Sequence, residues 1–494
     1  MIIPQLKNKM SLLPIDGVYP LSGRCRGSWF GTENSVNSFQ DLLQQYGSPL
    51  NLHNPEIFQS NISELKNHAA TMQLPLDIFF ARKANKCLEY LSVCKDSEIG
   101  VDVASYHELI QTLAVGIQGS QIICSAAVKS RELMKECLVN FVTIVVDNLE
   151  EFREIAQLSK EVNIEPCLCL RLSGFKANGK KLKSRFGIDI HQIEKTLQVI
   201  RTTFADKSIK LQGLQFHLSG YSAQERFRAL DQTLETVSSN QALVESISFI
   251  DIGGGLPVNY LAEKSQWLNF WGAIRCQTEE ESQWLTYNAS RLGLSRTDCD
   301  TRGSRCVYPF WQLQAGGEWL EQIFAKEGSS GIPLQKKAEQ MGLRFRCEPG
   351  RWLLKNCGVT LARVAHVKRM PDGEVYVSLF MNQTQCLTGS MDYMCDPYLV
   401  KAEGLTIPVV KRDTGYLFGS YCTETDLIIK RRLAFPAVVK RGDIILLENT
   451  AGYFMHFRES ESHQIPLAKN IIYKAQTDNL QPEFELDEID ASRV

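Results

Sequence analysis

Two reactive side chains each follow a short apolar run of the sequence. Lys83 comes after the run Leu76–Ala81, and Glu348 comes after the run Leu343–Cys347. Apolar walls lower the pKa of a lysine ammonium, so its free amine can form a Schiff base with an aldehyde. A carboxylate such as Glu348 could hold a proton on a heteroaromatic nitrogen. Read alone, such a lysine is more often a solvated residue, and such a glutamate is as often half of a structural ion pair.

Two further segments offer anion-binding geometry and an imidazole. The triplet Gly253–Gly255 carries no side chains, so backbone N–H groups there could approach an anion. Arg351 could pair with a phosphate through its fork of donors. His217 lies near the end of the run Leu211–Leu218. Tight glycine turns and structural histidines are common, so each signal is weak by itself.

The elements that would position these residues are apolar, β-rich runs alternating with amphipathic helical patterns. Near-continuous apolar strands separated by helices indicate a parallel sheet. Eight runs favour a closed (β/α)8 barrel, with an open doubly wound sheet as the alternative, and barrels place active sites at the carboxyl ends of their strands. The runs span residues 76–81, 99–103, 121–125, 142–147, 166–172, 211–218, 246–252 and 343–347.

The pattern changes after about residue 357, where strand-like runs dominate and helical periodicity is scarce. We therefore predict a barrel domain over residues 48–357 and a mainly antiparallel β domain over residues 1–47 and 358–494. An aromatic-rich insertion at about residues 262–340 interrupts the barrel. A packed subdomain is the favoured interpretation of this insertion, and a lid or partner surface stays open.

Composition excludes several classes of protein. The 494 residues carry 54 Lys and Arg against 56 Asp and Glu, which leaves no bulk positive field for nucleic acid. No apolar run approaches the roughly 20 residues of a membrane span, and no secretory signal opens the chain. Fifteen cysteines without a C-x-x-C pair predict a reduced, cytoplasmic protein. We predict no metal site, since a polar helix face explains His456, Glu459 and His463 better.

Together these segments resemble the pyridoxal-phosphate-dependent ornithine, diaminopimelate and arginine decarboxylases, which have the alanine-racemase-like fold (fold type III). The family's lysine motif Y-A-x-K-A-N appears here as Phe80-Ala-Arg-Lys-Ala-Asn85. Its G-x-D-x-A-S-x-x-E segment appears as Gly100-Val-Asp-Val-Ala-Ser-Tyr-His-Glu108, and its E-P-G-R tetrad as Glu348-Pro-Gly-Arg351. Several motifs in the right order are far more specific than any one of them.

The resemblance extends from roughly Pro49 to Tyr453 and so reaches the β domain. The family's K-F-G turn appears as Arg185-Phe-Gly187, and its G-P-x-C-[DE]-x-x-D segment as Gly419-Ser-Tyr-Cys-Thr-Glu-Thr-Asp426. Its G-A-Y segment appears as Ala451-Gly-Tyr453.

The resemblance implies a pyridoxal 5'-phosphate cofactor joined to Lys83 as an aldimine. It also implies a homodimer with shared active sites, in which Cys422 of the partner subunit donates the proton. The implied catalytic residues are Lys83, His217, Glu348 and Cys422. The implied cofactor-binding residues are Lys83, Asp102, Glu108, Arg171, His217, Ser219, Gly253, Gly254, Gly255, Glu348, Gly350, Arg351 and Tyr453.

Two departures from the family bear on the site. Ser219 and Gly220 are exchanged relative to the usual order, which moves the phosphate-facing hydroxyl by one residue. Thr423 stands where the family usually has an acid that pairs with the substrate's distal amine. The implied substrate-binding residues are Thr423, Glu424 and Asp426.

The expected function is decarboxylation of a small amino acid. Candidate substrates are ornithine, lysine or diaminopimelate of either hand, or a conjugate of one, in polyamine or siderophore biosynthesis. An amino-acid racemase of the same fold and a catalytically silent binding homologue are the alternatives.

Overall fold

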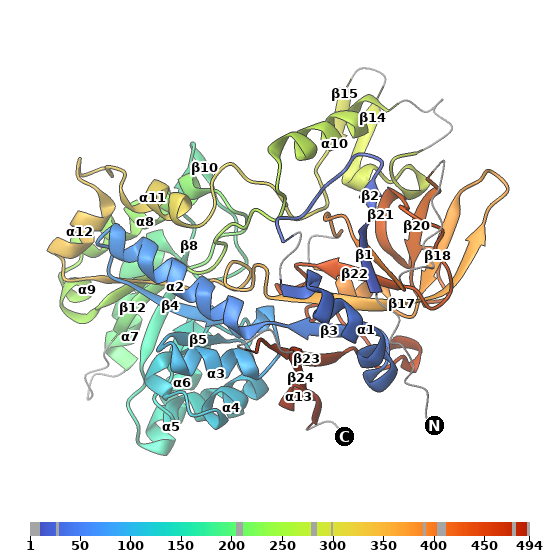
Figure 1. Ribbon diagram of the computed structural model, residues 1–494. Helices are drawn as coiled ribbons and strands as arrows, with labels where there is room; N and C mark the ends of the chain where they lie inside the picture. The colour runs from blue at the N-terminus through green and yellow to red at the C-terminus, as the bar shows by residue number, and fades with distance from the viewer. Residues whose placement is uncertain are drawn as a thin grey trace. The chain divides into compact units, whose positions relative to one another are not determined.

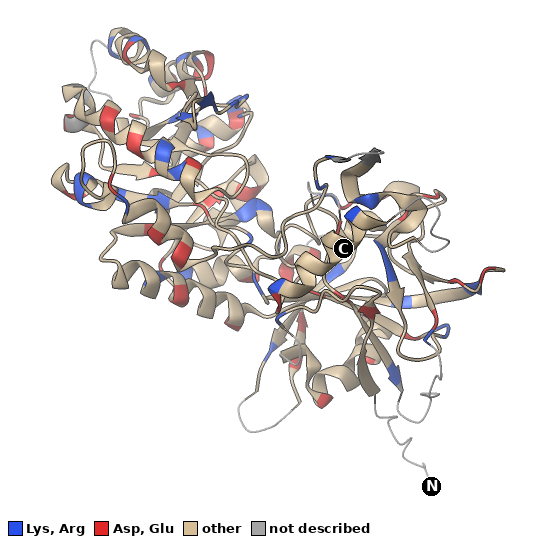
Figure 2. Cartoon of the chain, turned by 90° about the horizontal axis from the view of Figure 1, so that it is seen from above, with Lys and Arg blue, Asp and Glu red and all other residues tan. Residues whose placement is uncertain are grey.

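The computed structural model describes residues 10–25, 29–203, 211–277, 284–297, 300–388, 392–402, 412–476 and 481–491. The chain divides into two units, whose elements are labelled in Figure 1. The barrel unit comprises residues 58–257 and 314–353, and the β unit comprises residues 1–57, 258–313 and 354–494. In each unit Lys and Arg are interspersed with Asp and Glu (Figure 2).

The barrel unit is a closed ring of eight parallel strands in the order β8-β12-β13-β16-β4-β5-β6-β7, with β7 pairing back to β8. The closed-barrel prediction is therefore confirmed, and each predicted run overlaps one strand, with β8 ending one residue beyond its run. Phe79, Ile123, Val145, Cys169 and Phe249, from β4, β6, β7, β8 and β13, form a buried cluster. The strands are β4 (Leu76–Ala81), β5 (Gly100–Val103), β6 (Ile122–Cys124), β7 (Thr143–Val146), β8 (Leu168–Ser173), β12 (Leu211–Phe216), β13 (Phe249–Asp251) and β16 (Arg344–Cys347).

Helices connect successive strands of the ring, and several begin at a side-chain cap. The side chains of Ser105, Ser130, Asn148 and Ser222 accept hydrogen bonds from the first turns of α4, α5, α6 and α8. The helices are α2 (Pro55–Thr71), α3 (Glu89–Asp96), α4 (Tyr106–Ala114), α5 (Arg131–Val139), α6 (Leu149–Val162), α7 (Ile193–Thr203), α8 (Ala223–Ser238), α9 (Gln241–Ser246), α11 (Gly317–Phe324) and α12 (Leu334–Gln340).

The β unit is built on one sheet of eleven strands among the described residues. Its pairs are antiparallel except β18 with β20 and β3 with β23, so the prediction of a mainly antiparallel domain is confirmed. Helix α1 (Glu33–Tyr46) packs Phe39 and Leu43 against this sheet. The strands are β1 (Met10–Pro14), β2 (Asp16–Gly17), β3 (Leu50–His53), β17 (Gly358–Arg369), β18 (Val375–Leu379), β19 (Tyr398–Ala402), β20 (Thr414–Phe418), β21 (Leu427–Ala434), β22 (Ile444–Glu448), β23 (Lys469–Lys474) and β24 (Glu483–Leu486).

The stretch expected as one insertion is shared between the units. Residues 258–313, with α10 (Lys264–Cys276) and the hairpin β14 (Leu294–Thr297) and β15 (Asp300–Gly303), belong to the β unit. Residues 314–353 return to the barrel unit. The region around His456, expected as a helix face, instead forms turns. Among the described residues, no helix combines the length and apolarity that crossing a membrane requires.

Candidate active site

Lys83 lies immediately beyond strand β4, in a short 3-10 turn (Arg82–Ala84). Its Nζ is 2.6 Å from Oδ2 of Asp102, the penultimate residue of the neighbouring strand β5. The other oxygen of Asp102 accepts a hydrogen bond of 2.5 Å from the Ser125 hydroxyl. The Lys83 side chain keeps 31% of its surface exposed, whereas that of Asp102 is fully buried. Asp102 thus orients the amine from a buried position, while part of the lysine side chain stays accessible to solvent.

Glu348 is a buried carboxyl group just beyond strand β16, with only 2% of its surface exposed. Its Oε1 accepts a hydrogen bond of 3.1 Å from Gln215 Nε2, and its Oε2 lies 4.0 Å from His217 Nδ1. Burial and the nearby charges of Asp102 and Asp251 raise the pKa of Glu348 well above its usual range. Lys83 and Gln215 oppose this rise. The carboxyl group therefore has a strong tendency to hold or share a proton.

His217, whose imidazole lies close to Glu348, is a neutral ring. Its surroundings desolvate it and the cations Lys83, Arg226 and Arg171 repel a further proton, which lowers the pKa of His217 to about 3. Its Nδ1 accepts a hydrogen bond of 3.2 Å from the N–H of Gly254. This bond assigns the lone pair to Nδ1 and fixes the ring plane against the glycine loop.

Glycine is required in this triplet because neighbouring backbone atoms lie too close for a side chain. A Cβ on Gly253 would lie 2.6 Å from the carbonyl oxygen of Phe216, and one on Gly254 would lie 2.8 Å from that of Glu348. Gly253 and Gly255 also adopt φ values of +68° and +89°. Among the described residues, nothing accepts a hydrogen bond from the Gly255 N–H. The loop thus holds a backbone donor that an anion could occupy.

Arg226 on helix α8 ties this loop to the loop after β12. Its Nη2 donates to the carbonyl oxygens of Leu218, Gly220 and Gly254 at 3.1, 3.0 and 3.0 Å. The guanidinium is fully buried and lies 5.0 Å from the ring centroid of Trp319. Sequence reasoning missed Arg226 because an arginine within a helix carries no local signal of burial.

Gln215, Ser125 and Asp251 were also missed as members of the site. Gln215 stands two residues before His217, and that i, i+2 spacing on a strand could have indicated a shared face. Asp251 is fully buried, and burial raises its pKa to about 7, although the Gly253 N–H donates to it at 2.8 Å.

Other predicted barrel residues occupy the rim. Glu108 accepts a 2.6 Å hydrogen bond from the Ala104 N–H, so its carboxylate caps helix α4. The Arg171 guanidinium lies 4.4 Å from the ring centroid of Phe186. Ser219 is exposed in the loop after β12, Gly350 is buried after β16, and Arg351 hydrogen-bonds Tyr221.

The remaining predicted residues belong to the β unit. Cys422 and Thr423 are exposed, and Glu424 accepts a 3.4 Å hydrogen bond from Tyr287. Tyr453 contacts the ring of Phe457 edge to face at 5.4 Å. The carboxylate of Asp426, only 1% exposed, accepts bonds from the backbone N–H groups of Gln383 and Tyr421 at 2.8 and 2.7 Å. Asp426 thus holds the loop that carries Cys422.

The barrel residues fit a phosphorylated pyridine aldehyde. Lys83 offers an amine to an aldehyde, and Glu348 offers a buried carboxyl group to a ring nitrogen. The Gly255 N–H and Arg351 offer donors to a phosphate. These groups come from the carboxyl ends of β4, β13 and β16.

Comparison with known proteins also supports a pyridoxal-binding site in this chain. Residues 59–283 match the family model described as pyridoxal-dependent decarboxylase, pyridoxal binding domain. The chain is 27% identical over 431 residues to the uncharacterized protein y4yA of Sinorhizobium fredii, covering 86% of this chain and 88% of that protein. It is 21% identical to the diaminopimelate decarboxylase of Staphylococcus aureus, covering 84% of this chain and 86% of the relative.

Solved structures share the fold over nearly the whole chain. The diaminopimelate decarboxylase of M. jannaschii matches with a TM-score of 0.67 at 15% identity, covering 91% of each chain. The lysine/ornithine decarboxylase of Vibrio vulnificus, in complex with putrescine, matches with a TM-score of 0.63 at 18% identity, covering 89% of this chain and 98% of the other.

Proposed function

We propose that this chain is a pyridoxal-phosphate-dependent decarboxylase that removes the α-carboxyl group of an amino acid, because residues 59–283 match the model of the pyridoxal binding domain of these enzymes. The proposed substrate is a diamino acid such as ornithine, lysine or diaminopimelate, of either hand, or a conjugate of one. The observation that carries the proposal is the buried carboxyl group of Glu348 just beyond β16, the strand that pairs with β4, which Lys83 follows.

Lys83 and Glu348 would bind two groups of the cofactor, the aldehyde and the ring nitrogen. When bound, the cofactor supplies a conjugated ring that accepts the electron pair left by departing carbon dioxide. Glu348 would keep a proton at the ring nitrogen, and its raised pKa supports this role. Lys83 would hold the aldehyde carbon through its amine. Asp102 orients that amine through the 2.6 Å contact.

The rest of the barrel mouth would fix the orientation of the ring. The neutral imidazole of His217 is suited to lie against a flat aromatic face, because its Nδ1 is already occupied by the Gly254 N–H. The glycine loop and Arg351, with Ser219 and Tyr453, would hold the phosphate. These contacts would hold the ring in one orientation relative to the substrate.

Cys422 of a partner subunit would return the proton to the α-carbon. Its exposure at the surface of the β unit supports delivery to a second copy of the chain. The active form would accordingly be a homodimer, and the reduced thiol suits a cytoplasmic enzyme.

The direct test of this function is release of carbon dioxide by the holoenzyme. The panel contains L- and D-ornithine, lysine, arginine, diaminopimelate and their conjugates. We expect release from at least one member, with formation of the corresponding amine. Inversion of the α-carbon without loss of mass would instead show a racemase, and a protein that alters no member of the panel would contradict the proposal.

A further inference from the structure

A small β-hairpin follows strand β8 in the barrel unit. Strands β9 (Lys176–Ala177) and β10 (Lys180–Lys181) pair across a two-residue turn, in which Asn178 and Gly179 have φ values of 49° and 72°. The Gln232 side chain on α8 accepts a bond from the Lys176 N–H at 3.0 Å and donates to the Lys176 oxygen at 2.9 Å. The hairpin is therefore anchored on a helix of the barrel.

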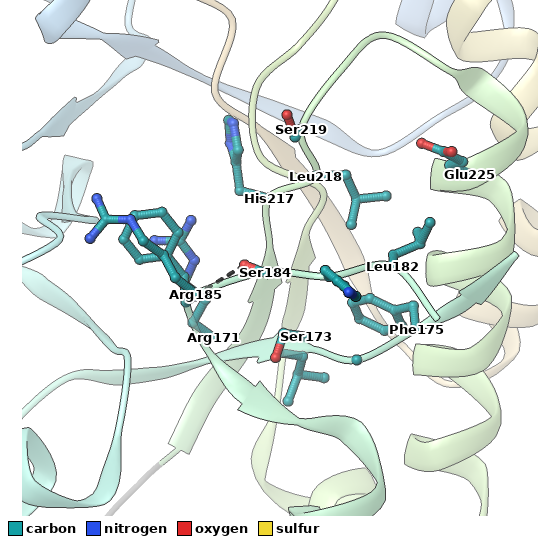
Figure 3. Close-up of a pocket in the computed structure, with 14 residues that line it drawn as sticks. Arg171, Ser173, Phe175, Leu182, Ser184, Arg185, His217, Leu218, Ser219 and Glu225 are labelled. Atoms are coloured by element: carbon teal, nitrogen blue, oxygen red, sulfur yellow. Dashed lines mark hydrogen bonds between the residues drawn. The ribbon is translucent and has the colours of Figure 1, made fainter. Parts of the chain in front are cut away.

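A cavity of about 500 Å³ is lined by residues 171–175 and 182–186, which flank this hairpin in the sequence, and by residues of the loop after β12 (Figure 3). Its lining includes His217 and Ser219, so the cavity adjoins the proposed active site. Phe175, Leu182 and Leu218 give it an apolar floor, with Leu182 donating its N–H to the Phe175 oxygen at 2.8 Å. The volume falls in the range usual for whole ligands, roughly 300–1,000 Å³.

The rim of the cavity is cationic. Lys183 and Arg185 are exposed, and neither has an acidic partner among the described residues. The Arg185 and Arg171 guanidinium carbons lie 4.0 and 4.4 Å from the ring centroid of Phe186, and Arg171 is 3.9 Å from Asp147. Glu225 is the acidic side chain among the lining residues. The rim would repel a terminal ammonium group and attract an anion.

We propose that this cavity binds the end of the substrate that is far from the reacting carbon. This end is an extended substituent that terminates in an anionic oxygen group, a carboxylate or a phosphate. The inference rests on the proposed function and gives its substrate a chemical class. Lys183 and Arg185 would pair with the anion, and Phe175, Leu182 and Leu218 would cover the apolar linker. Thr423, which replaces an amine-binding acid of the family, agrees with a substrate that ends without an ammonium group.

The test compares three probes that differ only in their tails: Nδ-acetyl-, Nδ-succinyl- and Nδ-phosphonoacetyl-ornithine. Binding to the holoenzyme is measured by titration calorimetry, which needs no turnover. We expect an anionic tail to bind about tenfold more tightly than the acetyl tail, the effect of one charge-assisted hydrogen bond. The double variant Lys183→Gln with Arg185→Gln should lose this preference. Lys180→Gln, on the same hairpin but outside the cavity lining, should keep it.

The outcomes separate the possible ligands. Preference for the succinyl tail identifies a carboxylate, and preference for the phosphonate identifies a phosphate. Equal binding of all three probes, or a preference that survives the double variant, overturns the inference even if carbon dioxide is released from ornithine. Tight, variant-sensitive binding without carbon dioxide release supports the cavity and contradicts the proposed function.

Discussion

At the scale of single residues, the site is a cluster of buried acids with few compensating cations. Burial raises the pKa of Asp251 to about 7, with a further rise from the charge of Asp102, and burial together with the charges of Asp102 and Asp251 raises the pKa of Glu348. Lys83 and Arg346 offset part of the rise at Asp251. Such an arrangement destabilises the empty protein and suits a ligand that carries a shared proton.

Glu348→Gln should stabilise the cofactor-free protein at high pH. The folded pKa of Glu348 lies above its unfolded value, so wild-type stability falls as the pH rises from about 4.5 toward the folded pKa. Glutamine has no such dependence. Chemical denaturation at pH 8 should give the variant a free energy of unfolding about 1–3 kcal/mol higher, while carbon dioxide release falls sharply.

The matched control for this prediction is Glu339→Gln, an exposed glutamate of the same unit, which should change neither quantity. A variant of Glu348 that is less stable than wild type at pH 8, or fully active, would contradict the role given to its proton.

At the scale of elements, helix α8 holds two loops of the site together. One buried guanidinium, that of Arg226, binds carbonyl groups after β12 and after β13. The loop after β13 carries the glycine triplet, and the loop after β12 carries His217. The helix therefore preorganises His217 and the glycine triplet.

Arg226→Met should weaken cofactor binding while the barrel stays folded. The loss of charge-assisted bonds should lower the free energy of unfolding by about 1.5–3 kcal/mol. The affinity for pyridoxal phosphate, measured by equilibrium dialysis, should fall at least tenfold. Arg228→Met, on the exposed face of the same helix, serves as control. Unchanged cofactor affinity in the Arg226 variant would show that the loops need no such tie.

The elements differ in how far the sequence alone predicts them. The barrel strands could be predicted because most of them are nearly continuous apolar runs, as expected for parallel strands buried on both faces. The roles of Glu108 and Asp426 could not be read in the same way. Their carboxylates cap backbone N–H groups, some contributed by distant residues such as Gln383, and only the folded chain brings these together. Arg226 could not be predicted either, because its contacts with the carbonyl groups of two loops form only in the folded chain.

At the scale of the whole molecule, the predicted catalytic residues are divided between the two units. Lys83, His217 and Glu348 lie in the barrel unit, and Cys422 lies in the β unit. A division of this kind suits a site shared by two subunits, each giving one part.

Mixing of two inactive variants tests this shared site. Lys83→Ala and Cys422→Ala chains, each inactive alone, should regain about a quarter of wild-type turnover after subunit exchange, because half of the dimers keep one complete site. Turnover is measured as carbon dioxide release. A mixture that stays inactive although mass spectrometry shows mixed dimers would count against a composite site.

The most direct test of the account is where the cofactor is attached. The holoenzyme is reduced with borohydride and digested, and the peptides are weighed by mass spectrometry. We predict a pyridoxyl-phosphate adduct on the peptide at Lys83, lost in a folded Lys83→Ala variant and retained in Lys86→Ala. An adduct on another lysine, or one that persists in Lys83→Ala, would contradict the central claim.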